Sequence, residues 1–529
     1  MTKKKHKKKL EVKEKKKAIT IWFEKWQNYL FPSFLFLIVF FLNLPLAKLQ
    51  LMSPDASGYL DMGKNLFTGK GAISSFNLYQ FWNGKYHPFL PYMQPIYPIV
   101  AGLIWILLNL KAVIGFNILL LGINCIFLYK IFRIKTDYIT SFFITLFFVF
   151  SQILVLPSIF PWTEHLHLFF LLSIIFLYLR YEKSKFFIGI LLGLSCLIRT
   201  ASFYNVFAFG IALILLNGFS KKSFKEYGTI LSGFLISYGL YEIFCYFKYK
   251  SFYPEYLICA KTYRAAEIYE GAFYKNSFPV LNMPSLKIEK QIIYANTKKH
   301  FIDFIKNFGY MKFVLGIAPL YFIYDIWKKK THLVSIFFLQ GIFVILGYTL
   351  SLYWLPEIES TRYSLIPFIT LVSIGLISIR EILIPLIFKK VKKLFSIIFV
   401  LFILPFLCLN IKQYFSFRNF YQNIYSPVYI RQIDPYRKER FEMYEWIKTN
   451  TEKDVLIASD FLRDAFLFER PFVSLPSGKA LNVKNMIDFL KIYSPDYILT
   501  YNESLINFLK SIGFKEKKII TPFILLSKK

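Results

Sequence analysis

The sequence predicts a polytopic α-helical membrane protein that ends in a small extracytoplasmic α/β domain. Three observations predict it. The chain of 529 residues is 56% hydrophobic, and only 18% of its residues are charged. Apolar runs of about 17 to 22 residues recur, which is the length that crosses a bilayer core of about 30 Å. From residue 434 onward no such run occurs, and short strand-like and helical patterns alternate instead.

The positive charge is distributed as it is in cytoplasmic loops. The net charge is +33, and its blocks lie between apolar runs, for example at residues 1–17, 180–185, 218–227 and 388–393. This placement follows the positive-inside rule, so we expect membrane lipid rather than nucleic acid as a partner. Residues 1–30 are predicted to be a basic cytoplasmic tail, either bound to anionic lipid or solvated. The five cysteines lack the spacing of a zinc site or a disulfide framework.

With the tail inside, the apolar runs define a membrane module over residues 31–411 with about 11–13 spans. The first span, at about 31–50, leads to an outer loop at 51–94, and a second large outer loop covers 248–310. The next spans are expected near 138–156 and over 165–180. They are followed by a short pair of spans that turns outside at Arg199 and by a span that ends near 247. Three further spans over 311–388 place 355–363 outside, and the last span lies near 394–410.

One stretch allows two interpretations. Residues 95–137 contain two apolar runs, yet the outer loop before them and the basic residues after them require an odd number of crossings. Either residues 95–110 lie in the interface as a re-entrant helix, or the positive-inside rule fails once here.

The C-terminal segment, residues 412–529, has a different character. A helical pattern precedes strand-like residues at 454–459, and further strand patterns at 472–476, 496–501 and 517–527 alternate with helical ones. Strands that alternate with helices predict a small parallel α/β domain, and about a hundred residues suffice for an independent core.

Ionisable residues gather at the outer ends of the predicted spans, where charges are costly and often functional. The most conspicuous is Asp55, which follows Pro54 at the start of a short helix in the first outer loop. An acidic residue in a first helical turn is favoured by the helix dipole, so a capping role alone explains Asp55 as well. Asp61 lies on another face of this helix and is expected to be structural. The shared outer face of the charged residues, rather than any one of them, indicates a site.

The order of the motifs resembles the GT-C superfamily of membrane glycosyltransferases, in particular the protein mannosyltransferases and the lipid A aminoarabinose transferase. The first outer loop is similar to the pattern D-x-x-x-Y-x-x-x-G/A, which Asp55, Tyr59 and Gly63 match. Residues 92–105 are similar to the proline-rich entry to the next segment. Relatives often have lysine before the proline pair, where this chain has Gln94.

Three later motifs extend the resemblance over most of the chain. Glu164 matches the acidic residue of a later outer turn, and Arg199 matches an arginine at the end of a helix of small residues. Arg362 and Tyr363 match an R-Y pair that precedes an apolar run containing proline. A terminal outer α/β domain is also common in this family.

The resemblance implies an enzyme that moves a hexose or pentose from a polyprenyl-phosphate donor to an extracytoplasmic lipid, glycan or protein. Asp55 is then the candidate general base, because an acceptor hydroxyl is a poor nucleophile until its proton is removed. Glu164 would position the acceptor or orient Arg199. The donor phosphate would be bound by some of Arg199, Arg362, Tyr363, Tyr59, Lys85 and His87, with the last two as substitutes for the missing lysine.

The same resemblance implies no nucleotide cofactor and allows a divalent metal, for which Asp55, Glu164 and His165 are the candidate ligands. Together with the basic tail it implies a bacterial plasma (inner) membrane, with the N-terminus cytoplasmic and the C-terminal domain outside.

Two other functions compete with this one. A lipid-linked glycan polymerase or ligase also uses outer-face arginines, but such proteins do not usually end in an outer α/β domain. A transporter or flippase would show an internal repeat or ionisable residues near the midplane. The sequence has no detectable repeat, and its charged candidates lie at one face.

Overall fold

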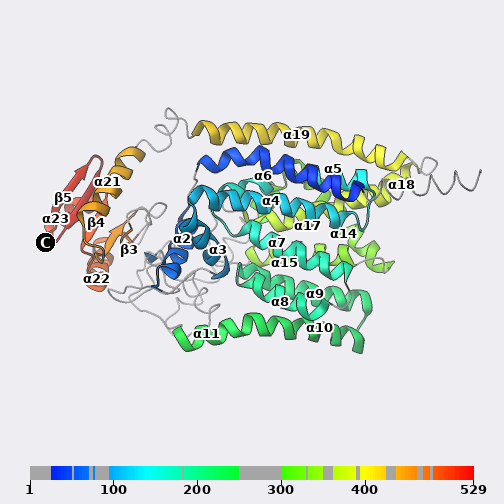
Figure 1. Ribbon diagram of the computed structural model, residues 1–529, viewed down its shortest axis with the longest axis horizontal. Coiled ribbons are helices and arrows are strands. Elements are labelled where there is room, and N and C mark those ends of the chain that lie inside the picture. Colours follow the sequence, from blue (N-terminus) through cyan, green and yellow to red (C-terminus); the bar gives the residue numbers. More distant parts are fainter. Residues whose placement is uncertain are drawn as a thin grey trace, which may run out of the picture.

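The computed structural model shows a long helical bundle with a small mixed domain at one end (Figure 1). It describes the following residues: 26–49, 53–70, 76–77, 94–181, 184–249, 301–328, 332–349, 362–388, 394–424, 436–460, 469–476 and 481–528. Lys85, His87 and most of the predicted outer loop at 248–310 lie outside the described residues.

The bundle consists of helices that run side by side along the long axis of the molecule (Figure 1). The first is the helix at Trp26–Lys48. It is followed by α4 (Leu110–Phe132), α5 (Tyr138–Val149), α6 (Gln152–Val155), α7 (Glu164–Arg180), α8 (Lys185–Cys196), α9 (Phe203–Asn217), α10 (Lys221–Phe234), α11 (Leu240–Tyr249), α14 (Lys312–Trp327), α15 (His332–Thr349), α17 (Leu365–Ser378), α18 (Ile384–Ile387) and α19 (Phe395–Ile424).

Six helices among the described residues are long and apolar enough to cross a membrane, or seven if the bent pair formed by residues 138–149 and 152–159 is one span. That pair replaces the straight span predicted near 138–156, since the chain turns by 66° between its two parts. Helices α7, α8, α14 and α15 are shorter and lie in the same bundle (Figure 1). The chain is therefore a multi-pass membrane protein, and the number of 11–13 spans stays a prediction.

The ambiguous stretch at 95–110 forms a short helix rather than a span. Helix α3 covers Ile96–Leu107, and its 12 residues reach only about 18 Å, less than a bilayer core. It packs along α2 (Pro54–Phe67) at the end of the bundle that faces the C-terminal domain (Figure 1). Of the two interpretations, the structure favours the interfacial helix.

Glycines make the contact between α2 and α3 possible. A Cβ atom added at Gly63 of α2 would lie 2.3 Å from the carbonyl oxygen of Pro98 and 2.6 Å from the Cα of Gly102 in α3. Only hydrogen fits on either side, so the two backbones touch directly. This explains in physical terms why the motif that begins at Asp55 ends in a glycine.

The C-terminal domain contains a six-stranded sheet in the order β1-β3-β2-β4-β6-β5. Its strands are β1 (Phe76–Asn77), β2 (Ile457–Ser459), β3 (Phe472–Ser474), β4 (Tyr497–Thr500), β5 (Lys515–Ile520) and β6 (Phe523–Ser527). Its helices are α21 (Arg437–Asn450), α22 (Val483–Tyr493) and α23 (Glu503–Ser511).

The prediction of a parallel sheet is wrong for one side of this domain. Strands β1, β3, β2 and β4 are parallel, but β6 runs antiparallel to β4, and β5 antiparallel to β6. Only two residues separate β5 from β6, and a connection this short can join only antiparallel strands. The sequence pattern at 517–527 was therefore two strands of a hairpin rather than one.

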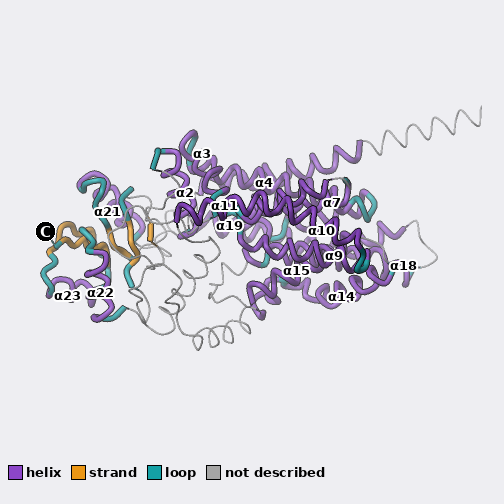
Figure 2. Tube along the Cα trace, turned by 90° about the horizontal axis from the view of Figure 1, so that it is seen from below, coloured by secondary structure: helices purple, strands orange, loops and turns teal. Residues whose placement is uncertain are grey.

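Two features join the sheet to the membrane module. Strand β1 belongs to the first outer loop and pairs with β3, which is almost 400 residues further along the chain. Buried side chains of α2, including Tyr59, Leu60 and Met62, also belong to one continuous apolar cluster with Met443 and Ile447 of α21. The view from below likewise places the sheet beyond the end of the bundle where α2 and α3 lie (Figure 2).

Candidate active site

Helix α2 presents Asp55 in its first turn. The cap of this helix is Ser53, whose side-chain oxygen accepts a hydrogen bond of 3.1 Å from the amide of Ala56. The capping role that could have explained Asp55 therefore belongs to Ser53. The Asp55 side chain is partly exposed and is free to serve another purpose. The carboxylate of Asp61 accepts a hydrogen bond from Asn65 one turn later, and its structural role stays a prediction.

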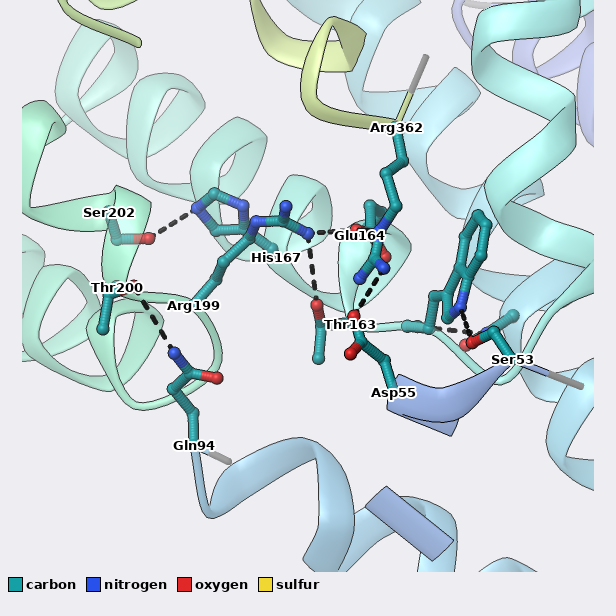
Figure 3. Close-up of polar contacts among 12 residues, drawn as sticks. Ser53, Asp55, Gln94, Thr163, Glu164, His167, Arg199, Thr200, Ser202 and Arg362 are labelled. Atoms are coloured by element: carbon teal, nitrogen blue, oxygen red, sulfur yellow. Dashed lines mark hydrogen bonds and ion pairs between the residues drawn. The ribbon is translucent and has the colours of Figure 1, made fainter. Parts of the chain in front are cut away.

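Arg362 joins the two predicted catalytic carboxylates (Figure 3). Its Nη1 donates to Oδ2 of Asp55 at 2.7 Å, and its Nε donates to Oε1 of Glu164 at 2.5 Å. Only 2% of the Arg362 side chain is exposed, so these are charge-assisted bonds in a poorly solvated place. Burial alone would lower the pKa of Arg362, but Glu164 and Asp55 raise it well above its ordinary value. Arg362 therefore stays charged.

Arg199 approaches Glu164 from the other side. Its Nη1 donates to the same Oε1 of Glu164 and, at 3.4 Å, to the hydroxyl of Thr163 (Figure 3). The ring of Tyr363 lies 4.6 Å from the Arg199 guanidinium and 5.4 Å from that of Arg362. Glu164 thus sits between two guanidinium groups, and Tyr363 packs against both.

Trp162 contacts Arg362 and Ser53 and so links the site to the start of α2. The Arg362 guanidinium lies 4.3 Å from the centre of its indole ring, in a cation–π contact. The indole N–H donates to Oγ of Ser53 at 2.7 Å, so one side chain contacts both Arg362 and the cap of α2. The Trp162 carbonyl in turn accepts a hydrogen bond from the buried Asn117 of α4. Nothing in the short sequence motifs pointed to this tryptophan.

Tyr59 lies behind Asp55 in the buried face of α2. Its ring meets that of Tyr97 in α3 edge to face, with centres 5.3 Å apart. Burial raises the pKa of Tyr59 well above its ordinary value, and the charge of Asp55 raises it further. Tyr59 therefore stays protonated. Its predicted contact with a donor phosphate stays a prediction.

His167 is a site residue that the motif comparison missed. It lies three residues after Glu164 in α7, so both side chains are on the same helix face, whereas His165 is not. Nε2 of His167 forms a hydrogen bond of 2.5 Å with Oγ of Ser202, which follows Arg199 (Figure 3). In the sequence, the i, i+3 spacing between Glu164 and His167 was the feature that could have indicated His167 as a site residue.

A small cavity lies at the centre of these residues. It is lined by Glu164, His167, Arg199, Val344, Arg362, Tyr363, Leu365 and Ile366. Its volume is ≈ 10 Å³, about the space of one water molecule. Oε2 of Glu164 is buried and has no hydrogen-bond partner in the part of the chain that the structure describes. The cavity thus offers both positive charge and an unused acceptor.

The three candidate metal ligands do not form a metal site as they are arranged. Asp55 and Glu164 are joined by the Arg362 guanidinium group instead of facing a common open space. No group of three His, Cys, Asp or Glu side chains with metal-binding geometry occurs among the described residues. These residues therefore do not fit a metal ion.

Gln94, which stands where relatives often have lysine, is anchored to the Arg199 turn. Its side-chain amide donates to the hydroxyl of Thr200 at 3.4 Å (Figure 3). Two residues later, the amide of Ile96 donates to the carbonyl of Leu197 at 3.2 Å. The end of the first outer loop is therefore fixed beside Arg199.

Solved membrane proteins share this architecture over nearly the whole chain. ArnT from Cupriavidus metallidurans bound to undecaprenyl phosphate superposes with a TM-score of 0.55 at 9% identity, covering 94% of this chain and 97% of its own. The oligosaccharyltransferase of Archaeoglobus fulgidus superposes with a TM-score of 0.57 at 12% identity, covering 90% of this chain and 70% of its own. The chain has the GT-C fold.

The GT-C fold is confirmed by structure alone. A second structure of the archaeal oligosaccharyltransferase, AglB in complex with an inhibitory peptide and a dolichol-phosphate, superposes with a TM-score of 0.50 at 12% identity. No protein-family model matches the sequence. No curated protein matches it at a significant level either.

Proposed function

We propose that this protein transfers a sugar from a polyprenyl-phosphate donor to an acceptor outside the cytoplasm, with Asp55 as the general base. The observation that carries the proposal is the cluster of Asp55, Glu164, Arg199 and Arg362 at one end of a GT-C bundle. Two carboxylates and two guanidinium groups, held together in a poorly solvated place, suit a reaction in which an anion leaves and a proton is removed.

Each group has a role in the proposed reaction. Asp55 takes the proton of the acceptor hydroxyl as the hydroxyl oxygen forms a bond to C1 of the donor sugar. The bond between C1 and the phosphate oxygen breaks, and its electron pair leaves with the polyprenyl phosphate. Arg199 and Arg362 stabilise that anion, which needs charge stabilisation rather than a proton. Glu164 holds both guanidinium groups and positions the acceptor.

The pairing of Arg362 with Asp55 also suggests that the donor binds before Asp55 removes a proton. While the two are paired, the carboxylate oxygen Oδ2 is occupied by Nη1 of Arg362. An entering phosphate competes for Arg362 and frees Asp55 to accept a proton. The base then becomes available only when the donor is in place, which would limit loss of the sugar to water.

The likeness to lipid-bound structures supports the choice of donor. ArnT was solved with undecaprenyl phosphate and AglB with a dolichol-phosphate. Both ligands are polyprenyl phosphates. Such a donor suits a site at the end of a membrane bundle, because its lipid chain stays in the bilayer while its phosphate reaches the surface. We place the N-terminus in the cytoplasm and the site and C-terminal domain outside, in a plasma (inner) membrane, because basic blocks occur at 1–17, 218–227 and 388–393.

The test is release of free polyprenyl phosphate by purified protein in lipid, with a panel of polyprenyl-phosphate sugars and candidate acceptors. Asp55→Asn should reduce release by about 10²- to 10⁴-fold, the usual contribution of a general base. Asp61→Asn is the matched control, because it removes a carboxylate of the same helix that binds Asn65. Release that persists in Asp55→Asn would remove Asp55 from the role of base. No release from any donor would contradict the transferase.

A further inference from the structure

The imidazole of His167 is held so that one nitrogen is used and the other is available. Nε2 is engaged with Oγ of Ser202 at 2.5 Å. Nδ1 makes no hydrogen bond within the described part of the chain, and the ring lines the cavity beside Arg199 and Glu164. His167 is 2% exposed, so its ring is held in a poorly solvated place.

The Ser202 contact can form with either tautomer of the imidazole, and the direction of its hydrogen bond decides which nitrogen carries the proton. When the Ser202 hydroxyl donates to Nε2, the neutral imidazole must hold its hydrogen on Nδ1. Nδ1 is then a hydrogen-bond donor on a ring that lines the same cavity as the two guanidinium groups. The cavity of ≈ 10 Å³ takes one oxygen atom.

We propose that His167 is a further ligand of the donor phosphate, with Nδ1–H donating to one phosphate oxygen between Arg199 and Arg362. Ser202 acts as the positioning residue that sets the tautomer of His167. The proposal rests on the proposed function, since it assumes a polyprenyl phosphate in this site. It adds a neutral donor to the two guanidinium groups, and a third donor further restricts the orientation of the bound phosphate.

Two substitutions separate this role from a merely structural one. The side-chain amide of asparagine reaches the position of Nδ1, whereas the longer amide of glutamine reaches that of Nε2. His167→Asn therefore keeps the proposed donor and loses the bond to Ser202. His167→Gln keeps a bond to Ser202 and loses the donor.

The experiment measures binding of undecaprenyl phosphate to the full-length protein in lipid nanodiscs, with undecaprenol as the control without a phosphate. We expect His167→Gln to bind about 10- to 100-fold more weakly than the wild type, the range for one lost hydrogen bond to a charged group. His167→Asn should stay within a few-fold of the wild type. Ser202→Ala should fall between the two, because Nε2 is then free and either tautomer forms.

The outcomes distinguish this proposal from the proposed function. Wild-type protein that binds undecaprenyl phosphate no better than undecaprenol would overturn both. Wild-type binding together with equal loss in His167→Asn and His167→Gln, or with no loss in either, would overturn only the role of His167. Stronger binding by His167→Gln than by His167→Asn would show that the bond to Ser202 is what matters. Thermal unfolding of each variant identifies losses caused by misfolding.

Discussion

At the scale of single residues, the site is organised around Arg362. Its planar guanidinium group presents Nε to Glu164 and Nη1 to Asp55, while its face lies on Trp162. Only arginine combines several donors in a fixed geometry with a face that stacks on an aromatic ring. One side chain therefore sets the distance between the two predicted catalytic carboxylates.

We expect Arg362→Lys to lower sugar transfer by about 10²-fold or more, because an ammonium group cannot bridge both carboxylates or hold a phosphate in the same orientation. Polyprenyl-phosphate release under saturating donor checks this. Arg380→Lys is a matched control, since Arg380 is also paired with a carboxylate, that of Asp137, away from the site. Equal losses in both variants would mean that the effect is one of general stability.

At the scale of elements, the contact between α2 and α3 places Asp55. Helix α2 carries Asp55 in its first turn and Gly63 two turns later, where it touches Gly102 of α3. Helix α3 is held in turn to the Arg199 turn through Ile96 and Leu197. The position of Asp55 relative to Arg199 therefore depends on two short helices that are not among the candidate spans.

We expect Gly63→Ala to destabilise the protein by about 1–3 kcal/mol, since its Cβ would overlap backbone atoms of α3 that cannot move aside cheaply. Sugar transfer should fall as well, because α2 shifts with Asp55. Thermal unfolding and polyprenyl-phosphate release check the two effects. Gly228→Ala in α10 is the control: nothing lies within 4 Å of its Cβ, and alanine is the better helix former by about 1 kcal/mol. A stable, active Gly63→Ala variant would refute the close contact.

At the scale of the whole molecule, the C-terminal domain is joined to helix α2, which carries Asp55. Glu469 forms ion pairs of 3.4 Å with both Lys64 of α2 and Lys448 of α21. These pairs lie beside the apolar cluster that α2 and α21 share. The domain therefore borders the candidate site and is in a position to influence α2.

The ion pairs of Glu469 predict a pH dependence. Burial alone would raise the pKa of Glu469, but Lys64 and Lys448 lower it below its ordinary value. A carboxylate with a depressed pKa adds stability above its unfolded pKa of about 4.3, and this is lost as the pH falls through the folded value. Glu469→Gln should therefore lower the unfolding temperature slightly at pH 7, and the difference from the wild type should shrink as the pH falls below the unfolded pKa of about 4.3. A difference that is independent of pH would contradict the ion pairs.

Much of the fold could be predicted from the sequence because its signals are local. Apolar run length indicated a multi-pass helical bundle, and period-two and helical patterns located β2, β3, β4, α22 and α23 close to their observed positions. The hairpin of β5 and β6 was missed because two short strands separated by two residues read as one apolar run. The bend of 66° at residues 150–151 was missed because an apolar run indicates the length of a buried segment but not whether its helix is straight.

The sequence by itself determined that the chain is a multi-pass membrane protein, and its motif order pointed to the GT-C fold and to Asp55, Glu164, Arg199 and Arg362. Apolar run length is sufficient for the first inference, whereas the second rests on the resemblance of the motif order to that family. Only the tertiary structure decided that Arg362 lies between Asp55 and Glu164, which are 307 and 198 residues away from it in the chain. Trp162 likewise became a candidate site residue only through packing, since contacts between distant segments depend on how helices meet and not on any short pattern.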